Sequence, residues 1–155
     1  MSETDPAVEF DFDADTGELV PAGTSATEEP EDADAGLFFG SADEFVRKRL
    51  RYMYRRGTAG LGRGQFHWLA AWWKSEEAMS RVDALWRSWE KARLDPGTGM
   101  SEWWLNHCDR HMSVLLSAEG PFGLSTDTSK PGEPLPYTAP PDRYFAKDKQ
   151  PPEEP

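Results

Sequence analysis

The sequence predicts a mainly α fold: a small three-helix, Trp-rich domain between a disordered acidic N-terminal tail and an extended Pro-rich C-terminal tail. Three stretches repeat apolar residues at helical spacing, and all seven tryptophans lie between residues 68 and 104. The first 36 residues hold twelve carboxylates and no Lys or Arg, whereas eight of the last 25 residues are proline. These observations divide the 155 residues into an acidic tail at 1–36, a helical domain at 37–125 and a second tail at 126–155.

The N-terminal tail is too polar to bury the apolar surface that would offset the entropy of ordering it, so we expect it to be mostly disordered. One exception is an apolar alternation with a turn-like centre: Val8, Phe10, Phe12, then Asp15-Thr16-Gly17 and Leu19-Val20. This pattern could form a hairpin or add to the sheet edge of a partner. A two-stranded hairpin is only marginally stable alone.

The first helix is predicted to begin at Ser41 and to end near Arg56, before a glycine-rich loop at 57–64. Ser41 followed by Glu44 forms a capping box, in which both side chains accept free backbone N–H groups of the first turn. Its apolar face consists of Val46, Leu50 and Met53.

The second helix follows Ser75 and continues to about Arg93, where Asp95-Pro96-Gly97 forms a turn that a helix cannot continue through. One stripe at 100° per residue collects its apolar side chains: Ala78, Met79, Val82, Leu85, Trp86, Trp89 and Ala92.

The third helix is predicted from Ser101 to about Ser117, and Glu119-Gly120-Pro121 ends it. Its apolar side is expected to hold Trp104, Cys108, His111 and Leu115.

The C-terminal tail is not expected to form a helix or a central strand, because proline fixes φ and lacks the backbone N–H. Four side chains could hold it against the domain: Leu135, Tyr137, Tyr144 and Phe145.

A ladder of basic residues occupies the polar face of the first helix, and we call Arg47, Lys48, Arg51 and Arg55 the basic ladder. Like charges at i, i+4 repel by roughly 0.2–0.5 kcal/mol per pair, so such a ladder is either a solvated face or a site for an anion. The anion could be a nucleic-acid backbone, an acidic partner protein or the chain's own acidic tail. In the last case the tail would compete with nucleic acid for the basic ladder and so gate nucleic-acid binding. The net charge of −11 does not exclude an anionic partner, because the residues after position 36 sum to +1.

Three histidines raise the possibility of a metal-dependent enzyme. His107 and His111 lie four residues apart on the third helix and could ligate one metal ion, with His67 as a further ligand. The alternative is a pair of hydrogen-bonded, partly buried histidines. Because the chain has one cysteine and no nucleophile motif, we predict no catalytic residue, no disulfide within the chain and no cofactor.

The tryptophans could form the core, and any that remain exposed would suit a protein interface. We predict Trp68, Trp72, Trp73 and Trp103 as aromatic contacts of a partner protein. No apolar run is long enough for a signal peptide or a membrane span, which predicts a cytoplasmic protein without membrane insertion. The oligomeric state stays open.

Several short segments together resemble the actinobacterial domain-of-unknown-function family 4913. They are Phe38-Phe39, Ser41 to Val46, Trp72-Trp73, Arg81, Ala84 to Arg87, Trp89-Glu90, Leu94 to Ser101, Trp103-Trp104, His107, Asp109, His111-Met112, Leu115-Leu116, Gly120 to Phe122, Pro134 to Pro136 and Tyr144-Phe145. The resemblance implies a small protein of an actinobacterial plasmid, integrative element or phage, often encoded among conjugation genes, with no established activity. It also implies a cysteine and a later histidine after Phe122, but residues 123–134 contain neither, which argues further against a metal site.

We therefore expect a non-enzymatic accessory protein that binds another protein of a mobile element. A weak nucleic-acid-binding protein that uses the basic ladder is the first alternative. A metal-dependent enzyme centred on His107 and His111 is the second.

Overall fold

The structure, a computed structural model, describes residues 10–12, 19–21, 36–60 and 64–146 of the chain. The chain divides into two compact units, Met1–Gly36 and Leu37–Pro155, and each is described by itself. The elements in order are β1 (Phe10–Phe12), β2 (Leu19–Pro21), α1 (Ala42–Phe45), a π-helical segment η1 (Val46–Leu50), α2 (Arg51–Met53), a 3-10 turn η2 (Trp72–Lys74), α3 (Glu76–Ala92), α4 (Gly99–Trp103), a second π-helical segment η3 (Trp104–Cys108) and α5 (Asp109–Leu115).

The first unit contains the predicted hairpin. Strands β1 and β2 pair antiparallel, with Phe10 opposite Pro21 and Phe12 opposite Leu19. The hairpin prediction is confirmed. The disorder predicted for the tail concerns residues 1–9, 13–18 and 22–35, which lie outside the described residues.

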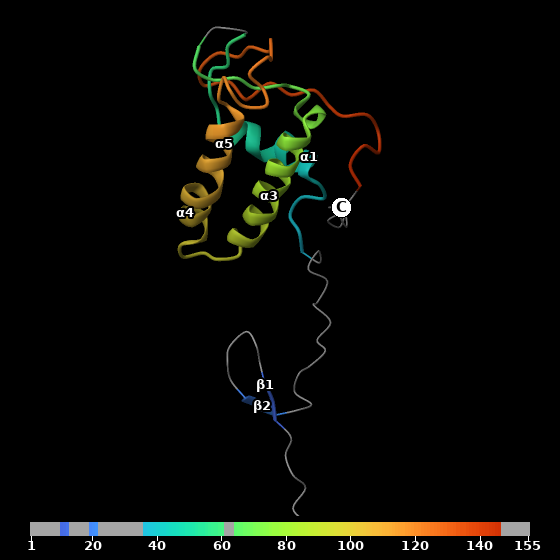
Figure 1. Ribbon diagram of the computed structural model, residues 1–155, viewed down its shortest axis with the longest axis vertical. Coiled ribbons are helices and arrows are strands. Elements are labelled where there is room, and N and C mark those ends of the chain that lie inside the picture. Colours follow the sequence, from blue (N-terminus) through green and yellow to red (C-terminus); the bar gives the residue numbers. More distant parts are fainter. Residues whose placement is uncertain (1–9, 13–18, 22–35, 61–63, 147–155) are drawn as a thin grey trace, which may run out of the picture. The chain divides into compact units, whose positions relative to one another are not determined.

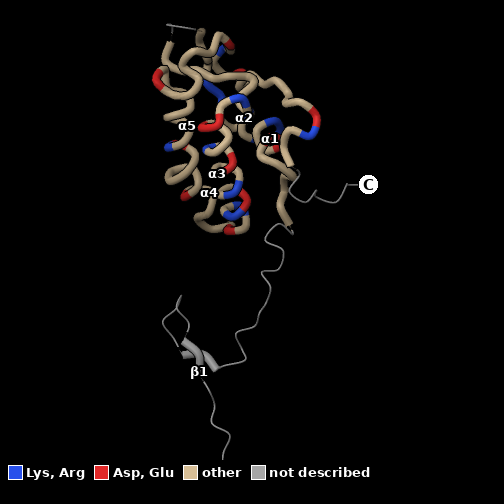
Figure 2. Tube along the Cα trace, turned by 45° about the vertical axis from the view of Figure 1, so that its right-hand side comes forward, with Lys and Arg blue, Asp and Glu red and all other residues tan. Residues whose placement is uncertain are grey.

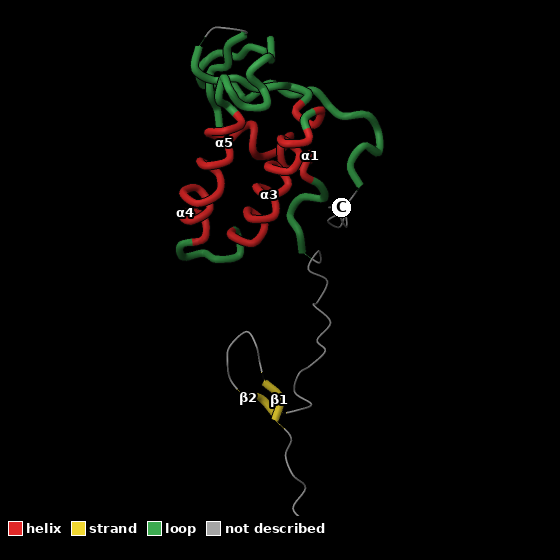
Figure 3. The backbone as a smooth tube through the Cα atoms, in the orientation of Figure 1, coloured by secondary structure: helices red, strands yellow, loops and turns green. Residues whose placement is uncertain are grey.

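In the second unit, three helical stretches pack together around one aromatic core, which confirms the predicted mainly α, tryptophan-rich domain. Figure 1 shows α3 lying alongside α4 and α5, and α3 also contacts α1. Charged residues of both signs are distributed along these helices (Figure 2). Most of the loops gather at one end of the helices, and the loop between α3 and α4 lies at the other end (Figure 3).

The first helical stretch runs from Ala42 to Met53, so it ends about three residues earlier than predicted. Its start confirms the predicted cap: Ser41 Oγ accepts the N–H of Glu44 at 3.1 Å, and Glu44 Oε2 accepts the N–H of Gly40 at 2.8 Å. The Glu44 carboxylate therefore satisfies the N–H one residue before the cap instead of that of Ser41.

The π-helical segment η1 changes which residues of this stretch face the core. Four buried residues recur at every fourth position, Ala42, Val46, Leu50 and Tyr54, and Phe45 is buried beside Val46, whereas Met53 is half-buried. A π-helical turn, with its i→i+5 hydrogen bond, contains more residues than the 3.6 of an α-helical turn. Residues four positions apart therefore stay on the same side of the helix. Met53 packs against the core, as predicted, and Tyr54 completes the series of buried residues.

The second helix, α3, matches its predicted stripe and contains no π-helical turn. Ser75 Oγ caps it by accepting the N–H of Ala78 at 3.2 Å. Its buried face also contains a charged residue, Glu90, which is only 4% exposed.

Glu90 joins the start of the domain to α3 through hydrogen bonds. Its carboxylate accepts the backbone N–H groups of Phe38 and Phe39 at 2.8–3.0 Å and the indole N–H of Trp86 at 3.3 Å. Arg93 Nε donates to it at 3.0 Å. A carboxylate removed from water needs such donors, so Glu90 fixes where the chain enters the domain.

The third helical stretch, from Gly99 to Leu115, buries two of the four predicted residues, Cys108 and Leu115, together with two that were not predicted, Trp103 and Met112. Trp103, Cys108, Met112 and Leu115 are fully buried, whereas Trp104 and His111 are half-buried. Because η3 is a π-helical segment, Trp103 and Cys108, which are five positions apart, both reach the core. The indole N–H of Trp103 donates to Leu85 O and to Ser88 Oγ, both at 3.1 Å, and joins α4 to α3.

Residues 126–146 contain no helix or strand, yet they pack closely against the helical domain. Their backbone N–H groups donate to the carbonyls of Thr58, Arg51 and Ala70 at 2.9–3.1 Å. Leu135 is fully buried, and this segment, which we call the C-terminal strap, is therefore part of the domain's packing.

Aromatic contacts hold the far end of the strap. The ring of Tyr144 lies 5.0 Å from that of Trp73, and Phe145 stacks on Trp72 at 5.5 Å. The indoles of Trp68 and Trp73 donate to strap carbonyls at 3.0 Å. The predicted contacts of Leu135, Tyr137, Tyr144 and Phe145 with the domain are all present.

In the described part of the chain, no helix combines the length and the apolar character needed to cross a bilayer.

Candidate partner-binding surface

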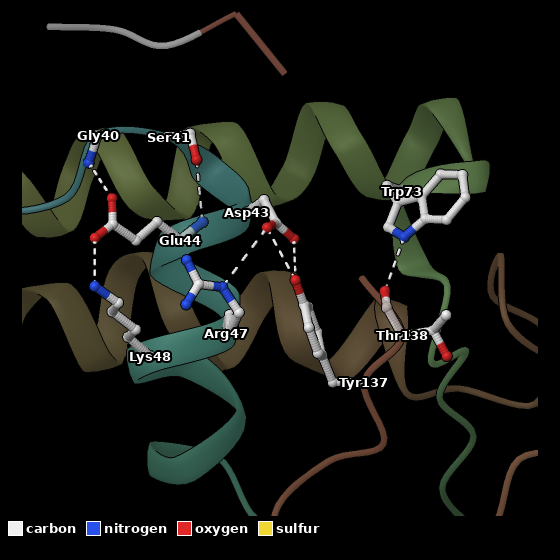
Figure 4. Close-up of polar contacts among 9 residues, drawn as sticks. All are labelled: Gly40, Ser41, Asp43, Glu44, Arg47, Lys48, Trp73, Tyr137 and Thr138. Carbon is white, nitrogen blue, oxygen red and sulfur yellow. Dashed lines mark hydrogen bonds and ion pairs between the residues drawn. The ribbon is translucent and has the colours of Figure 1, made fainter. Parts of the chain in front are cut away.

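The first half of the basic ladder pairs with carboxylates one turn earlier on the same helix. Arg47 Nε lies 4.0 Å from Asp43 Oδ2, and Lys48 Nζ lies 2.8 Å from Glu44 Oε1 (Figure 4). Both cations keep about half of their side-chain surface exposed. Exposed pairs of this kind contribute about 0–1 kcal/mol, so Arg47 and Lys48 remain able to bind another anion.

Asp43 connects this half of the ladder to the C-terminal strap. The hydroxyl of Tyr137 donates to both carboxylate oxygens of Asp43, at 2.8 and 2.9 Å (Figure 4). Burial raises the pKa of Asp43 above its ordinary value, although the bond from Tyr137 and the charge of Arg47 oppose this rise. Burial also raises the pKa of Tyr137 to about 12, so Tyr137 remains a hydrogen-bond donor at neutral pH.

The second half of the ladder binds the strap directly. Arg51 Nε donates to Leu135 O and Arg55 Nη1 donates to Gly132 O, both at 2.9 Å. These two guanidinium groups thus hold backbone carbonyls, and part of the ladder is structural. Each retains further N–H donors, because a guanidinium carries five.

An exposed tyrosine lies in the middle of the ladder. Tyr52 is 45% exposed, and the guanidinium carbons of Arg51 and Arg55 lie 4.9 and 5.8 Å from its ring centre. Arg51 Nη1 also donates to the Tyr52 hydroxyl at 3.0 Å. We call Tyr52 together with the basic ladder the basic face. Sequence reasoning missed Tyr52, although its place between two arginines on the polar side of the helix could have indicated it.

The four tryptophans predicted as partner contacts belong to the core. Trp68, Trp72 and Trp103 have no exposed surface, and Trp73 is 9% exposed. The C-terminal strap packs on the three that precede α3, and α3 covers Trp103. These side chains cannot touch a partner while the domain is folded, so their predicted role is wrong. Tyr52 is the aromatic residue that the basic face exposes instead.

The three histidines predicted as metal ligands have separate environments. His107 is exposed, His67 is buried with its backbone N–H bonded to Leu116 O, and His111 Nδ1 lies 3.2 Å from Arg81 Nη1. Burial lowers the pKa of His111, and the charges of Arg81 and His107 lower it further. Among the described residues, no group of three or more His, Cys, Asp or Glu side chains could hold a metal ion.

A comparison with protein families identifies one family whose model matches the chain. Residues 39–141 match the model of a family described as Domain of unknown function (DUF4913), which is more than half of the chain. The chain belongs to the DUF4913 family. The match includes α1 to α5 and the strap as far as Pro141, so the DUF4913 domain contains both the basic face and the carbonyls that Arg51 and Arg55 bind. No curated protein and no solved structure matches the chain.

Proposed function

We propose that this protein is a non-enzymatic accessory protein whose basic face binds an acidic segment of a partner protein. The observation that carries the proposal is the exposed ring of Tyr52 between Arg51 and Arg55, because tyrosine and arginine are enriched among the residues that dominate protein interfaces. Residues 42–56 hold six basic and two acidic residues, a local balance of +4. Charge complementarity then favours a partner with clustered carboxylates.

The family resemblance suggests where to search for that partner. We propose that it is encoded with this protein on an actinobacterial mobile element, among conjugation genes, and that the two proteins meet in the cytoplasm.

The test is direct binding of the full-length protein to each co-encoded protein, measured by biolayer interferometry. At least one partner should bind at micromolar concentration, and Tyr52→Ala should weaken it about tenfold or more, as expected for an interface anchor. The double variant Arg47→Ala/Lys48→Ala should also weaken partner binding. The loss should be larger at low salt than at high salt, because salt screens the charges.

Two matched variants serve as controls. Tyr144→Ala removes another tyrosine that is 46% exposed, and Lys91→Ala removes an exposed cation of α3. Both should bind like the wild type. Absence of any micromolar partner, or equal loss in the Tyr52 and Tyr144 variants, would contradict the proposal.

Nucleic acid is the second candidate ligand, because Arg47, Lys48 and Arg49 are three consecutive exposed cations. Binding to phosphates releases counterions, so the logarithm of the affinity would fall linearly with the logarithm of the salt concentration, with a slope of about one per phosphate neutralised. Titration of labelled DNA and RNA at several salt concentrations distinguishes this from partner binding. A salt slope unchanged by Arg47→Ala/Lys48→Ala would remove the candidate.

A further inference from the structure

A cavity of about 630 Å³ lies where the chain after α2, the segment before Trp68 and the end of α5 come together. Among its lining residues are Tyr54, Arg56, Phe66, Leu116, Ser117 and Glu119. This volume is within the range of about 300–1,000 Å³ typical of sites for small ligands.

The feature that distinguishes this cavity is the guanidinium of Arg56, which has aromatic neighbours but few polar partners. Its guanidinium carbon lies 4.4 Å from the ring centre of Tyr54 and 5.9 Å from that of Phe66. The described residues give this guanidinium one hydrogen bond, from Nη1 to Arg55 O at 2.8 Å, and no ion pair. The group is therefore held in place by aromatic rings while most of its donors are unused.

Arg87 shows the usual arrangement for comparison. Its guanidinium carbon also lies 4.4 Å from an aromatic centre, that of Trp86. However, Arg87 Nε has a carboxylate at 3.8 Å, on Asp83. The stacking is the same in both places, but Arg56 lines a cavity where Arg87 has a carboxylate.

We propose that this cavity binds an organic monocarboxylate with an apolar body, whose carboxylate pairs with Arg56. A planar guanidinium matches a carboxylate through two parallel hydrogen bonds. Tyr54, Phe66 and Leu116 provide apolar walls for the body of the ligand, and Ser117 and Gln65 offer neutral polar groups.

The charges around the cavity favour a monoanion over a dianion such as phosphate. Glu119 lines the cavity and is exposed, and Asp109 accepts the Tyr54 hydroxyl at 3.3 Å. Because these two carboxylates outnumber the one guanidinium, a second negative charge on the ligand would add repulsion that no further cation among the described residues of the cavity lining offsets.

The experiment titrates the full-length, isotope-labelled protein with N-acetylphenylalanine and, separately, with its uncharged amide, and follows amide chemical shifts. The acid should bind about tenfold or more tightly than the amide, with shifts at Gln65, Ser117 and Glu119. Arg56→Gln should abolish the difference between acid and amide, Arg56→Lys should retain part of it, and Arg87→Gln should leave it unchanged. Glu119→Gln should strengthen binding of the acid by removing a like charge.

Two sources could supply such a carboxylate, a free organic acid or the carboxyl terminus of a polypeptide. A hexapeptide ending in phenylalanine, compared with its carboxyl-terminal amide, distinguishes them: tighter binding than N-acetylphenylalanine assigns the polypeptide terminus, and equal binding assigns the free acid. Equal binding of acid and amide by the wild type would overturn the proposal, as would no shift at millimolar concentration. The wild-type comparison needs no variant, so a variant that fails to fold does not remove the test.

Discussion

Replacing Glu90 by glutamine should destabilise the domain far more than any exposed charge substitution. The amide retains the size of the carboxylate, but it replaces one acceptor oxygen by an N–H₂ group. The wild-type carboxylate accepts from Phe38, Phe39 and Trp86 and pairs with Arg93, while only 4% of Glu90 is exposed. The substitution therefore leaves at least one buried donor facing another donor, and it removes the anion beside Arg93.

The expected loss follows from these interactions. Removing one member of a buried charge pair costs about 3–5 kcal/mol. Because the Arg93 side chain is 24% exposed and water can partly replace its partner, we expect a loss near the lower end, about 3 kcal/mol. This is a large fraction of the roughly 5–15 kcal/mol that stabilises a typical domain.

Urea unfolding followed by tryptophan fluorescence measures this loss. With a slope of about 2 kcal/mol per molar urea, the midpoint should fall by about 1.5 M. Glu77→Gln is the matched control on the same helix, because Glu77 pairs with Arg81 at 3.2 Å but is 50% exposed, and it should cost less than about 1 kcal/mol. A Glu90→Gln midpoint within error of the control would refute the assignment of Glu90 as the residue that fastens the start of the domain.

The strap, the buried cysteine and Asp43 give three further predictions. A chain ending at residue 125 should lose cooperative thermal unfolding, because it lacks the buried Leu135 and the strap carbonyls that Trp68 and Trp73 bind. Thermal unfolding followed by circular dichroism measures this, and a sharp transition near that of the wild type would contradict the prediction. Cys108 is buried and burial raises its pKa to about 12, so a thiol reagent at pH 8 should label it only at the rate of unfolding, and immediate labelling of the native protein would count against its position in the core. Burial raises the pKa of Asp43, so the folded state holds the proton of this carboxyl group more tightly than the unfolded chain does. The contribution of Asp43 to stability therefore falls as pH rises from about 4 through its folded pKa. The urea midpoint of Asp43→Asn, measured at pH 3.5 and pH 7 against the wild type, should therefore shift in favour of the variant at the higher pH.

The regular elements of the fold could be predicted where local periodicity determines them. In α3, the residues at 3.6-residue spacing are also those that the structure buries, and Ser75 caps it as a serine before a helix should. The helical stretches before and after it each contain a π-helical segment, and no local pattern indicates one. A π turn is favoured only when packing against other elements compensates for its weaker geometry. For that reason the burial of Tyr54 and Trp103, which exceeds that of Met53 and Trp104, could not be predicted.

The candidate surface depended on tertiary contacts even more strongly. The basic ladder was visible as a spacing, but the binding of Arg51 and Arg55 to Leu135 and Gly132 joins residues about eighty positions apart. The same strap packs on Trp68, Trp72 and Trp73, and Tyr52 is the exposed aromatic residue of the basic face.

By itself, the sequence determined the mainly α class, the approximate places of three helices, the hairpin in the acidic segment and the resemblance to the DUF4913 family. Only the tertiary structure decided which side chains are buried, what the basic residues bind and where a cavity remains beside Arg56. The physical reason is that helix periodicity and capping act within a few residues, whereas burial and the pairing of charges depend on which distant segments pack together.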